Sequence, residues 1–422
     1  MEIATDNPRY LAVLALRDIE KNGEYSNIAL KRHMSEKLSA ADRRLFSALV
    51  YTTLTHKLRI DYIISRFCAA GKSSATVRNI LRIGVCQICF MDKIPHSAAV
   101  NECVNIAKAQ AKYAAGFVNS VLRNVSRNCR NIEFPMRDNI IEYLMYEYSY
   151  PLWLVEKWLG MYGADFCEKL LAAQNTPPPI CIRVNTLKMT AQELAGKIKL
   201  TPTAHKNAFF IEGTNIEKEP SYINGELTVM DISSMTACEK AGVRPGMDVL
   251  DMCAAPGGKA VYLAELMENR GGITAFDLHP HRVELIRKNA ARMEAAIICA
   301  ECADSSVTRE SLRNRFDVVL LDAPCSGLGV IRSKPDIKWK DPVVIPAIVE
   351  TQKKLITAGA EYVKAGGTLV YCTCTLNRDE NEDVVSSLLS KRDDYIIEES
   401  TTLFPHIDNT NGFFIARLKK EV

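Results

Sequence analysis

The 422-residue sequence contains no apolar run long enough to cross a membrane, since a spanning helix needs about 20 consecutive apolar residues. It also lacks a basic amino-terminal stretch followed by an apolar one, so we expect no secretory signal peptide. The 14 cysteines are scattered through apolar segments and do not form a short disulfide framework. This pattern favours reduced thiols, and we therefore expect a cytoplasmic protein.

The sequence also lacks a motif that would grip a pyrophosphate. Residues 250–259 (LDMCAAPGGK) place a glycine turn between a predicted strand and a predicted helix. A P-loop would need glycine at Cys253 and serine or threonine at Ala260, and the turn does not follow the pattern G-x-G-x-x-G. The glycines still let a ligand approach the backbone at the start of a helix. A nucleoside ligand without a pyrophosphate fits best, and S-adenosylmethionine is such a ligand.

Two acidic residues follow the next predicted strands. Asp277 follows the strand predicted at 273–276 and suits the ribose hydroxyls of a nucleoside. Asp304 follows the strand predicted at 295–299, where it suits an adenine amino group. The alternative interpretation is ordinary turn chemistry without a ligand.

The amino-terminal part of the chain is basic and helical. Residues 1–130 contain 20 Lys and Arg against 10 Asp and Glu, whereas the remainder contains 33 against 40. Apolar residues recur there only at helical spacing, and Ser39 is a candidate N-cap, so we predict an all-α domain. The excess charge predicts contact with nucleic acid, although a solvated Arg-rich surface is the alternative. Candidate phosphate contacts are Arg82, Lys108, Lys112 and Arg123.

The rest of the chain predicts two further parts, which makes the fold class multidomain. Residues 131–230 predict a connector and a small α+β subdomain, with a sharp break at the TPPP sequence of 176–179. Residues 231–422 alternate strands and helices. This alternation predicts an α/β, Rossmann-like doubly wound parallel sheet.

Two cysteines stand where predicted buried strands end. Cys325 lies in LLDAPCSG (320–327) and Cys374 in LVYCTCT (369–375). Ligands of open α/β sheets bind beyond the carboxyl ends of the strands, and the fourth and fifth strands of such a sheet are neighbours, so we expect both thiols to face one pocket. A thiolate that adds to C6 of a pyrimidine makes C5 able to accept a methyl group. A carboxyl group would stabilise that adduct, and a base must remove the C5 proton. Cys374, Asp322 and Cys325 supply this set.

The joint motifs resemble bacterial ribosomal RNA cytosine-C5 methyltransferases of the RsmB (Sun/Fmu) type. The resemblance rests on residues 251–259, on 322–332, on PDIKW at 335–339 and on Thr-Cys-Thr with the later Glu380-Asn381-Glu382. In addition, IRVNT at 182–186 resembles the segment before that family's catalytic domain. Residues 1–130 resemble its NusB-like RNA-binding domain.

The resemblance implies a reaction and a set of site residues. Cys374 is implied as the attacking thiol, Cys325 as the group that assists product release, and Asp322 as a catalytic neighbour. The substrate is implied to be 16S rRNA, naked or in an early assembly intermediate. We expect a monomer without a metal. The implied contacts to S-adenosylmethionine are Cys253, Ala254, Ala255, Pro256, Gly257, Gly258, Lys259, Asp277, Arg282, Asp304 and Asp322.

Two functional alternatives remain open. The same chemistry on tRNA would keep the enzyme and change its substrate. A non-catalytic RNA-binding factor in transcription or ribosome assembly would use the NusB-like part alone, although the intact Asp322, Cys325 and Cys374 speak against it.

Other cysteines are interpreted as packing. Cys86-x-x-Cys89 and Cys299-x-x-Cys302 have the spacing of zinc pairs, but they fall in different predicted domains, and buried small side chains are the preferred interpretation. Cys372 is likewise expected in the core. Lys259 has two interpretations, a contact to the cofactor carboxylate or a cap of the glycine turn.

Overall fold

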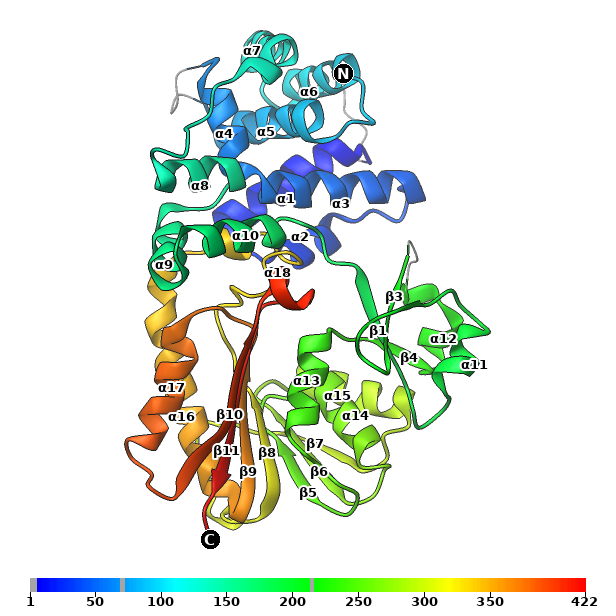
Figure 1. Ribbon diagram of the computed structural model, residues 1–422. Coiled ribbons are helices and arrows are strands. Elements are labelled where there is room, and N and C mark those ends of the chain that lie inside the picture. Colours follow the sequence, from blue (N-terminus) through cyan, green and yellow to red (C-terminus); the bar gives the residue numbers. More distant parts are fainter. Residues whose placement is uncertain (1–5, 69–72, 213–215) are drawn as a thin grey trace. The chain divides into compact units, whose positions relative to one another are not determined.

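The computed structural model describes residues 6–68, 73–212 and 216–422, and the chain divides into two compact units (Figure 1). Residues 1–176 and 331–340 form the first, or helical, unit; residues 177–330 and 341–422 form the second, or sheet, unit. This division is coarser than the predicted three parts, whose boundaries at 130 and 230 stay a prediction. Among the described residues, no helix is both long and apolar enough to span a membrane.

The described part of the helical unit contains helices and no strand, which confirms the all-α prediction. Ser39 is the predicted N-cap: its side chain accepts a hydrogen bond from the backbone N–H of Asp42 at 3.1 Å. The α-helices are α1 (Pro8–Asn22), α2 (Ser26–His33), α3 (Ala40–Thr55), α4 (Lys57–Ser65), α5 (Ala75–Phe90), α6 (His96–Gln110), α7 (Ala115–Asn128), α8 (Ile140–Tyr148), α9 (Leu152–Tyr162) and α10 (Ala164–Gln174).

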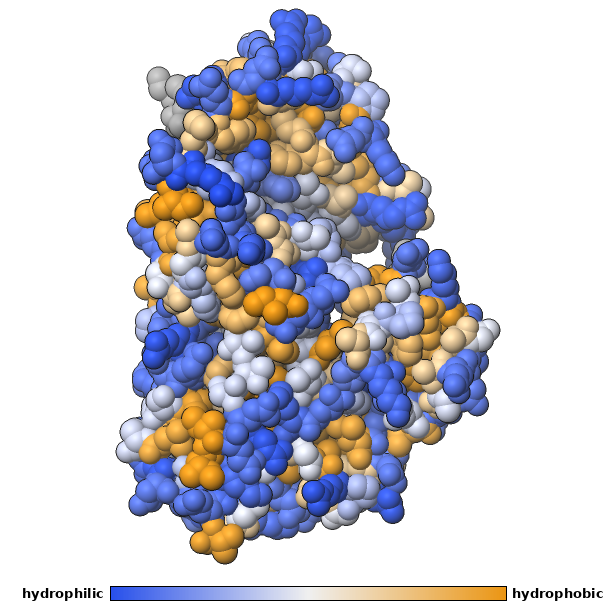
Figure 2. Space-filling model, viewed as in Figure 1, coloured by the Kyte–Doolittle hydropathy of each residue, from blue (hydrophilic) through white to orange (hydrophobic). Residues whose placement is uncertain are grey.

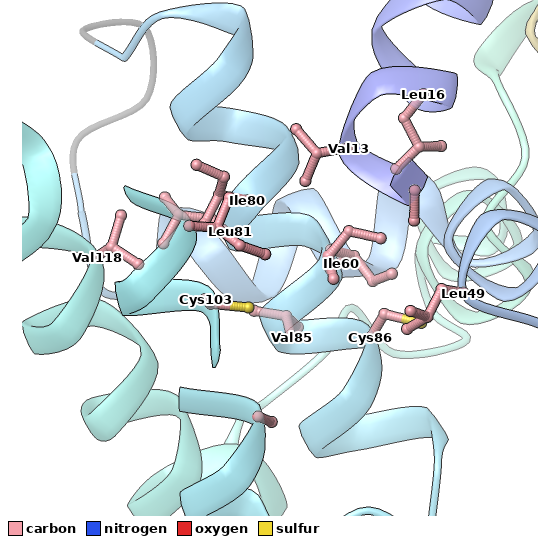
Figure 3. Close-up of a cluster of buried hydrophobic side chains, with 14 of the residues drawn as sticks. Val13, Leu16, Leu49, Ile60, Ile80, Leu81, Val85, Cys86, Cys103 and Val118 are labelled. Carbon is pink, nitrogen blue, oxygen red and sulfur yellow. The ribbon is translucent and has the colours of Figure 1, made fainter. Parts of the chain in front are cut away.

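Helix α5 forms the centre of the core of this unit. Its Ile80, Leu81 and Val85 are fully buried and lie among side chains from α1, α3, α4, α6 and α7 (Figure 3). Cys86 and Cys103 belong to the same core, where burial raises the pKa of each thiol to about 12. These two thiols therefore act as small apolar side chains.

The prediction that Arg82 contacts phosphate is wrong. Arg82 lies on α5 and is only 3% exposed, and its guanidinium donates to both carboxylate oxygens of Asp61 at 2.6 and 2.7 Å. It also pairs with Glu20. Two acidic partners far away in the sequence thus compensate the buried cation. Lys108, Lys112 and Arg123 are exposed on or next to α6 and α7, where Figure 2 shows mostly hydrophilic side chains, and their contact with RNA stays a prediction.

The segment 331–340, which contains PDIKW, packs within the helical unit. Lys338 is fully buried; its ammonium donates to the carbonyl of Thr55 at 2.7 Å and lies 4.0 Å from the centre of the Tyr150 ring. Burial lowers the pKa of Lys338 well below its usual range. The indole N–H of Trp339 donates to the carbonyl of Leu54 at 2.7 Å. In the structure these motif residues therefore hold the segment in place.

The sheet unit contains a small antiparallel sheet of order β2-β3-β1-β4. Arg183, on β1, is fully buried, pairs with Glu265 and lies over the Tyr262 ring at 4.4 Å. The side-chain amide of Asn185 donates to two backbone carbonyls at 2.8 Å each. The IRVNT motif therefore joins the small sheet to its neighbours within the unit. The elements are β1 (Ile180–Val184), α11 (Ala191–Ala195), β2 (Thr201–Pro202), β3 (Ala208–Ile211), α12 (Pro220–Ile223) and β4 (Leu227–Val229).

Removal of Arg183 should destabilise the sheet unit. We expect Arg183→Met to lower its free energy of unfolding by about 3–5 kcal/mol, because Glu265 would remain buried without its partner. The readout is amide hydrogen exchange of β1 and of the helix that carries Glu265. Arg287→Met, at an exposed pair with Glu284, should leave that exchange unchanged. Equal protection in both variants would contradict the prediction.

The large sheet has seven strands in the order β10-β11-β9-β8-β5-β6-β7. Strands β5 to β9 are parallel, whereas β11 is antiparallel to both β9 and β10. Helices α16 and α17 cover one face, and α13, α14 and α15 cover the other (Figure 1). The elements are α13 (Ile232–Lys240), β5 (Asp248–Asp251), α14 (Gly258–Leu266), β6 (Gly272–Asp277), α15 (Pro280–Met293), β7 (Ile298–Cys302), β8 (Phe316–Asp322), α16 (Ile345–Tyr362), β9 (Val363–Thr373), α17 (Glu382–Leu389), β10 (Tyr395–Leu403), α18 (Pro405–Asp408) and β11 (Phe413–Lys420).

The sheet corrects three predictions. It is mixed and not purely parallel, because β11 runs antiparallel to β9 and to β10, a largely exposed and polar edge strand that no apolar run in the sequence predicts. The third parallel strand lies at 298–302 and not at 295–299, since the N–H of Ala295 still caps α15 by donating to the carbonyl of Ala290. Because β7 is also an edge strand, Cys299 and Cys302 are exposed, so their predicted burial is wrong.

Candidate functional site

A cavity of about 470 Å³ lies beyond the carboxyl ends of the parallel strands of the large sheet. Such strand ends are the usual ligand position in an open α/β sheet. The cavity brings together both strand-end thiols and three of the predicted acidic residues. These lining residues are Asp277, Asp304, Asp322, Cys325 and Cys374.

Strands β8 and β9 place the two cysteines side by side. They are adjacent and parallel, as predicted, and Asp322 pairs with Cys372 in the register. The N–H of Gly329 donates to the carbonyl of Cys374 at 3.0 Å, which holds the loop after β8 against the loop after β9. As a result, the sulfurs of Cys325 and Cys374 are 3.3 Å apart, although the residues are 49 positions apart in the sequence.

The surroundings of Cys325 favour its protonated form. The hydrogen bond to Cys374, burial, and the nearby carboxylates of Glu380 and Asp322 raise the pKa of Cys325 well above its usual range. Cys325 therefore stays protonated at neutral pH. A protonated thiol at this distance is able to donate a hydrogen bond to the sulfur of Cys374.

Asp322 has a partly buried cation, Lys259, as its partner. The ammonium of Lys259 donates to Oδ2 of Asp322 at 2.6 Å, and the thiol of Cys372 lies 3.7 Å from Oδ1. Although burial opposes its charge, the Asp322 carboxylate raises the pKa of Lys259. Lys259 thus has a partner that neither of its two sequence interpretations foresaw. Cys372 is fully buried, as expected.

The glycine turn opens onto a second, smaller cavity of about 210 Å³. Gly257 caps α14 with φ +101°, a left-handed conformation that favours glycine, and a Cβ on Gly258 would meet nothing within 4 Å. Cys253, Ala255 and Asp322 line both cavities, which makes the two cavities neighbours. Ala254, Pro256, Gly258 and Lys259 line only the smaller one, and Gly257 lines neither.

The predicted nucleoside contacts line the larger cavity. Asp277 is 3% exposed, accepts a hydrogen bond from the N–H of His279 at 3.1 Å and lies 3.4 Å from the guanidinium of Arg282. Asp304 accepts hydrogen bonds from the N–H and hydroxyl of Ser306, which lower its pKa. Both carboxylates are therefore held as acceptors at the strand ends.

Asp251, the last residue of β5, is a candidate site residue that the sequence pattern did not predict. Asp251 is fully buried and lines the smaller cavity, and neither of its carboxylate oxygens meets a donor with good geometry among the described residues. Burial and the neighbouring Asp322 raise the pKa of Asp251 to about 7. A ligand ammonium would satisfy this side chain. In the sequence Asp251 stands directly before the glycine turn and belongs to the motif at 251–259, where no role of its own is predicted for it.

Glu380, which the sequence shows only as the first residue of the Glu-Asn-Glu motif, is a second residue whose role was not predicted. Its carboxylate is fully buried, and it accepts a hydrogen bond from the N–H of Ser326, the residue after Cys325, at 2.8 Å. Within the described residues, no group of three His, Cys, Asp or Glu is arranged to hold a metal ion.

Three family models match successive parts of the chain. The model described as 16S rRNA methyltransferase RsmB/F matches residues 242–419. The NusB family matches residues 6–127, and the RsmF/B-like ferredoxin-like domain matches residues 150–217. The order of these matches follows the order of the predicted helical, middle and catalytic parts.

Full-length relatives agree with these models. The "Probable ribosomal RNA small subunit methyltransferase B" of Bacillus subtilis (strain 168) is 36% identical, with 98% of each chain covered. The protein of the same name from Synechocystis sp. (strain ATCC 27184 / PCC 6803 / Kazusa) is 33% identical and covers 98% of this chain and 99% of its own. The solved structure titled PH0851 has a TM-score of 0.81 at 26% identity, with both chains fully covered. The chain therefore belongs to the RsmB/F family of S-adenosylmethionine-dependent methyltransferases of small-subunit ribosomal RNA.

Proposed function

We propose that this protein methylates C5 of a cytosine in 16S rRNA through a covalent bond between Cys374 and C6 of the base. The observation that carries the proposal is the 3.3 Å contact between the sulfurs of Cys325 and Cys374 in a cavity that Asp322 also lines. Two thiols and a carboxyl group are the groups that this chemistry requires. The RNA is naked 16S rRNA or an early assembly intermediate, and the target base must leave its stack to reach the thiol.

The reaction has two stages, an attack on C6 and a release of the product, and each of the two cysteines has its main role in one of them. Cys374 attacks C6 as the thiolate, which the protonated Cys325 stabilises by a hydrogen bond, and Asp322 lies where it can stabilise the adduct. S-adenosylmethionine supplies the methyl group that C5 then accepts. Once Cys374 is bonded to C6, the hydrogen bond that contributes most to the raised pKa of Cys325 is lost, and Cys325 gives its proton to solvent. The Cys325 thiolate then accepts the C5 proton, the electrons of the C5–H bond restore the C5–C6 double bond, and the electrons of the C6–S bond return to Cys374.

The two neighbouring cavities fit the parts of the cofactor. Asp277 and Asp304 present carboxylates to the larger cavity, where they suit ribose hydroxyls and an adenine amino group. Asp251 presents an unsatisfied carboxylate to the smaller one, where it suits the ammonium of the methionine part. Cys253 and Ala255, which line both cavities, lie between these two ends.

The pKa of Asp251 predicts a pH dependence of cofactor binding. The ammonium requires the ionised carboxylate, and with a pKa of about 7 that form becomes populated as the pH rises. We therefore expect the affinity for S-adenosylmethionine to rise roughly tenfold between pH 5.5 and 7. In Asp251→Asn, calorimetry should show binding about 100-fold weaker at pH 7 and no such rise. The control Asp317→Asn, at the opposite end of the sheet, should bind S-adenosylmethionine as the wild type does. If the affinity of Asp251→Asn still rose with pH, the assignment of Asp251 to the cofactor ammonium would be contradicted.

Nucleoside analysis tests the function itself. Purified protein, protein-free 16S rRNA and methyl-labelled S-adenosylmethionine should yield labelled 5-methylcytidine, and bisulfite mapping would then locate it. Unfractionated tRNA in a parallel reaction distinguishes the alternative substrate. If tRNA is not labelled, and 16S rRNA is labelled neither as naked RNA nor in an assembly intermediate, a non-catalytic RNA-binding role becomes the better account.

A further inference from the structure

Glu380 is a buried carboxylate that hydrogen bonds hold, without a cationic partner among the described residues. It lies in the short helical turn Arg378–Glu380, is fully buried and forms no ion pair in the described part of the chain. Several groups donate hydrogen bonds to it: the N–H and hydroxyl of Ser326 at 2.8 and 2.5 Å, Asn377 at 2.9 Å, Gln352 at 3.2 Å and Thr375 at 3.4 Å. Burial of a carboxylate is costly unless hydrogen bonds compensate, so this site is built around the side chain.

The donors come from both catalytic loops. Ser326 directly follows Cys325, and Thr375 directly follows Cys374; their hydroxyl oxygens are 2.8 Å apart. Gln352, from α16, also donates to the carbonyl of Pro324 at 2.9 Å, so the loop is held on both sides of Cys325. One carboxylate therefore links the residues adjacent to the two sulfurs.

We propose that Glu380 is a positioning residue for the methyl transfer, which ties the Cys325 loop to the Cys374 loop and thereby sets the contact between the two sulfurs. This proposal rests on the proposed function, in which Cys325 and Cys374 act in the same methyl-transfer reaction. Glu380 acts on the two sulfurs through Ser326 and Thr375, whose hydrogen bonds to its carboxylate join the two loops. Its negative charge also helps to keep Cys325 protonated, together with Cys374 and Asp322.

The test is Glu380→Gln, which keeps the shape of the side chain but replaces one acceptor oxygen with a donor. We expect kcat for methyl transfer to fall about 10- to 100-fold, because a displacement on the order of 1 Å has this effect on oriented groups. KM for RNA and for S-adenosylmethionine should stay within about threefold. In addition, the pH midpoint for alkylation of Cys325 by iodoacetamide, followed by peptide mass spectrometry without RNA, should move about half a unit or more to lower pH.

Asp317→Asn is the matched control. Asp317 is a carboxylate at the opposite end of β8, where it accepts hydrogen bonds from the N–H of Asp248 and from Lys364, and its removal should change neither readout. Ser326→Ala is the milder variant, with an expected three- to tenfold fall in kcat, and it carries the test if Glu380→Gln does not fold.

Two results would overturn the proposal. The first is a folded Glu380→Gln variant with the kcat and the Cys325 midpoint of the wild type. The second is a fall in kcat that follows a loss of thermal stability while the Cys325 midpoint stays in place, which would make the role structural. Failure of the proposed function looks different, since the wild type itself would then methylate no RNA.

Discussion

Replacement of Cys374 by alanine should abolish methyl transfer. Without this sulfur, C6 has no nucleophile at the strand ends of β8 and β9, and C5 of cytosine is a poor methyl acceptor by itself. In this variant the hydrogen bond from Cys325 to Cys374 is lost, but burial and the carboxylates of Glu380 and Asp322 still raise the pKa of Cys325, so we do not expect it to replace the nucleophile. We expect activity at least about 1,000-fold below the wild type, measured as labelled 5-methylcytidine in 16S rRNA.

Two further variants, Cys374→Ser and Cys299→Ala, are the controls for this result. Serine keeps the size and hydrogen-bonding ability of the side chain, so an equally inactive Cys374→Ser variant would attribute the loss to the thiolate and not to a small cavity. Cys299 is exposed on the edge strand β7, and its alanine variant should retain full activity. Wild-type activity in Cys374→Ala would refute the covalent mechanism.

The site could be predicted from the sequence where it depends on strand order. Short apolar runs before Cys325 and Cys374 identified β8 and β9, and the rule that ligands bind at the carboxyl ends of parallel strands brought the thiols together. The edges of the sheet were harder. Strands β10 and β7 are largely exposed and lack continuous apolar runs. As a result, no apolar run predicts β10, and the strand predicted for β7 begins three residues too early.

The missed residues depend on contacts that sequence spacing does not reveal. Arg82 looked like a free cation because its partners, Asp61 and Glu20, lie 21 and 62 positions away. Glu380 takes its role from Ser326, 54 positions away, and Asp251 from a cavity that only the folded sheet creates. Local patterns therefore predict the elements and the reacting groups, whereas the polar network that orients those groups follows from the tertiary structure.

Replacement of Cys325 by alanine should leave attack possible and impair release. Cys374 would still bond to C6 and C5 would still be methylated, but the group that assists loss of the C5 proton would be missing. A protein–RNA adduct should therefore accumulate. We expect a slowly resolved band on a denaturing gel that contains both protein and RNA and that forms only with S-adenosylmethionine present.

The double variant shows which sulfur carries the RNA. Cys325→Ala with Cys374→Ala should give no band, because the adduct depends on the attacking thiol. Peptide mapping of the trapped band should locate the nucleotide on Cys374. An adduct on another cysteine, or free turnover by Cys325→Ala at the wild-type rate, would contradict the division of roles between the two sulfurs. Because they lie 3.3 Å apart, only the fate of the covalent intermediate can separate the attacking sulfur from the one that assists release.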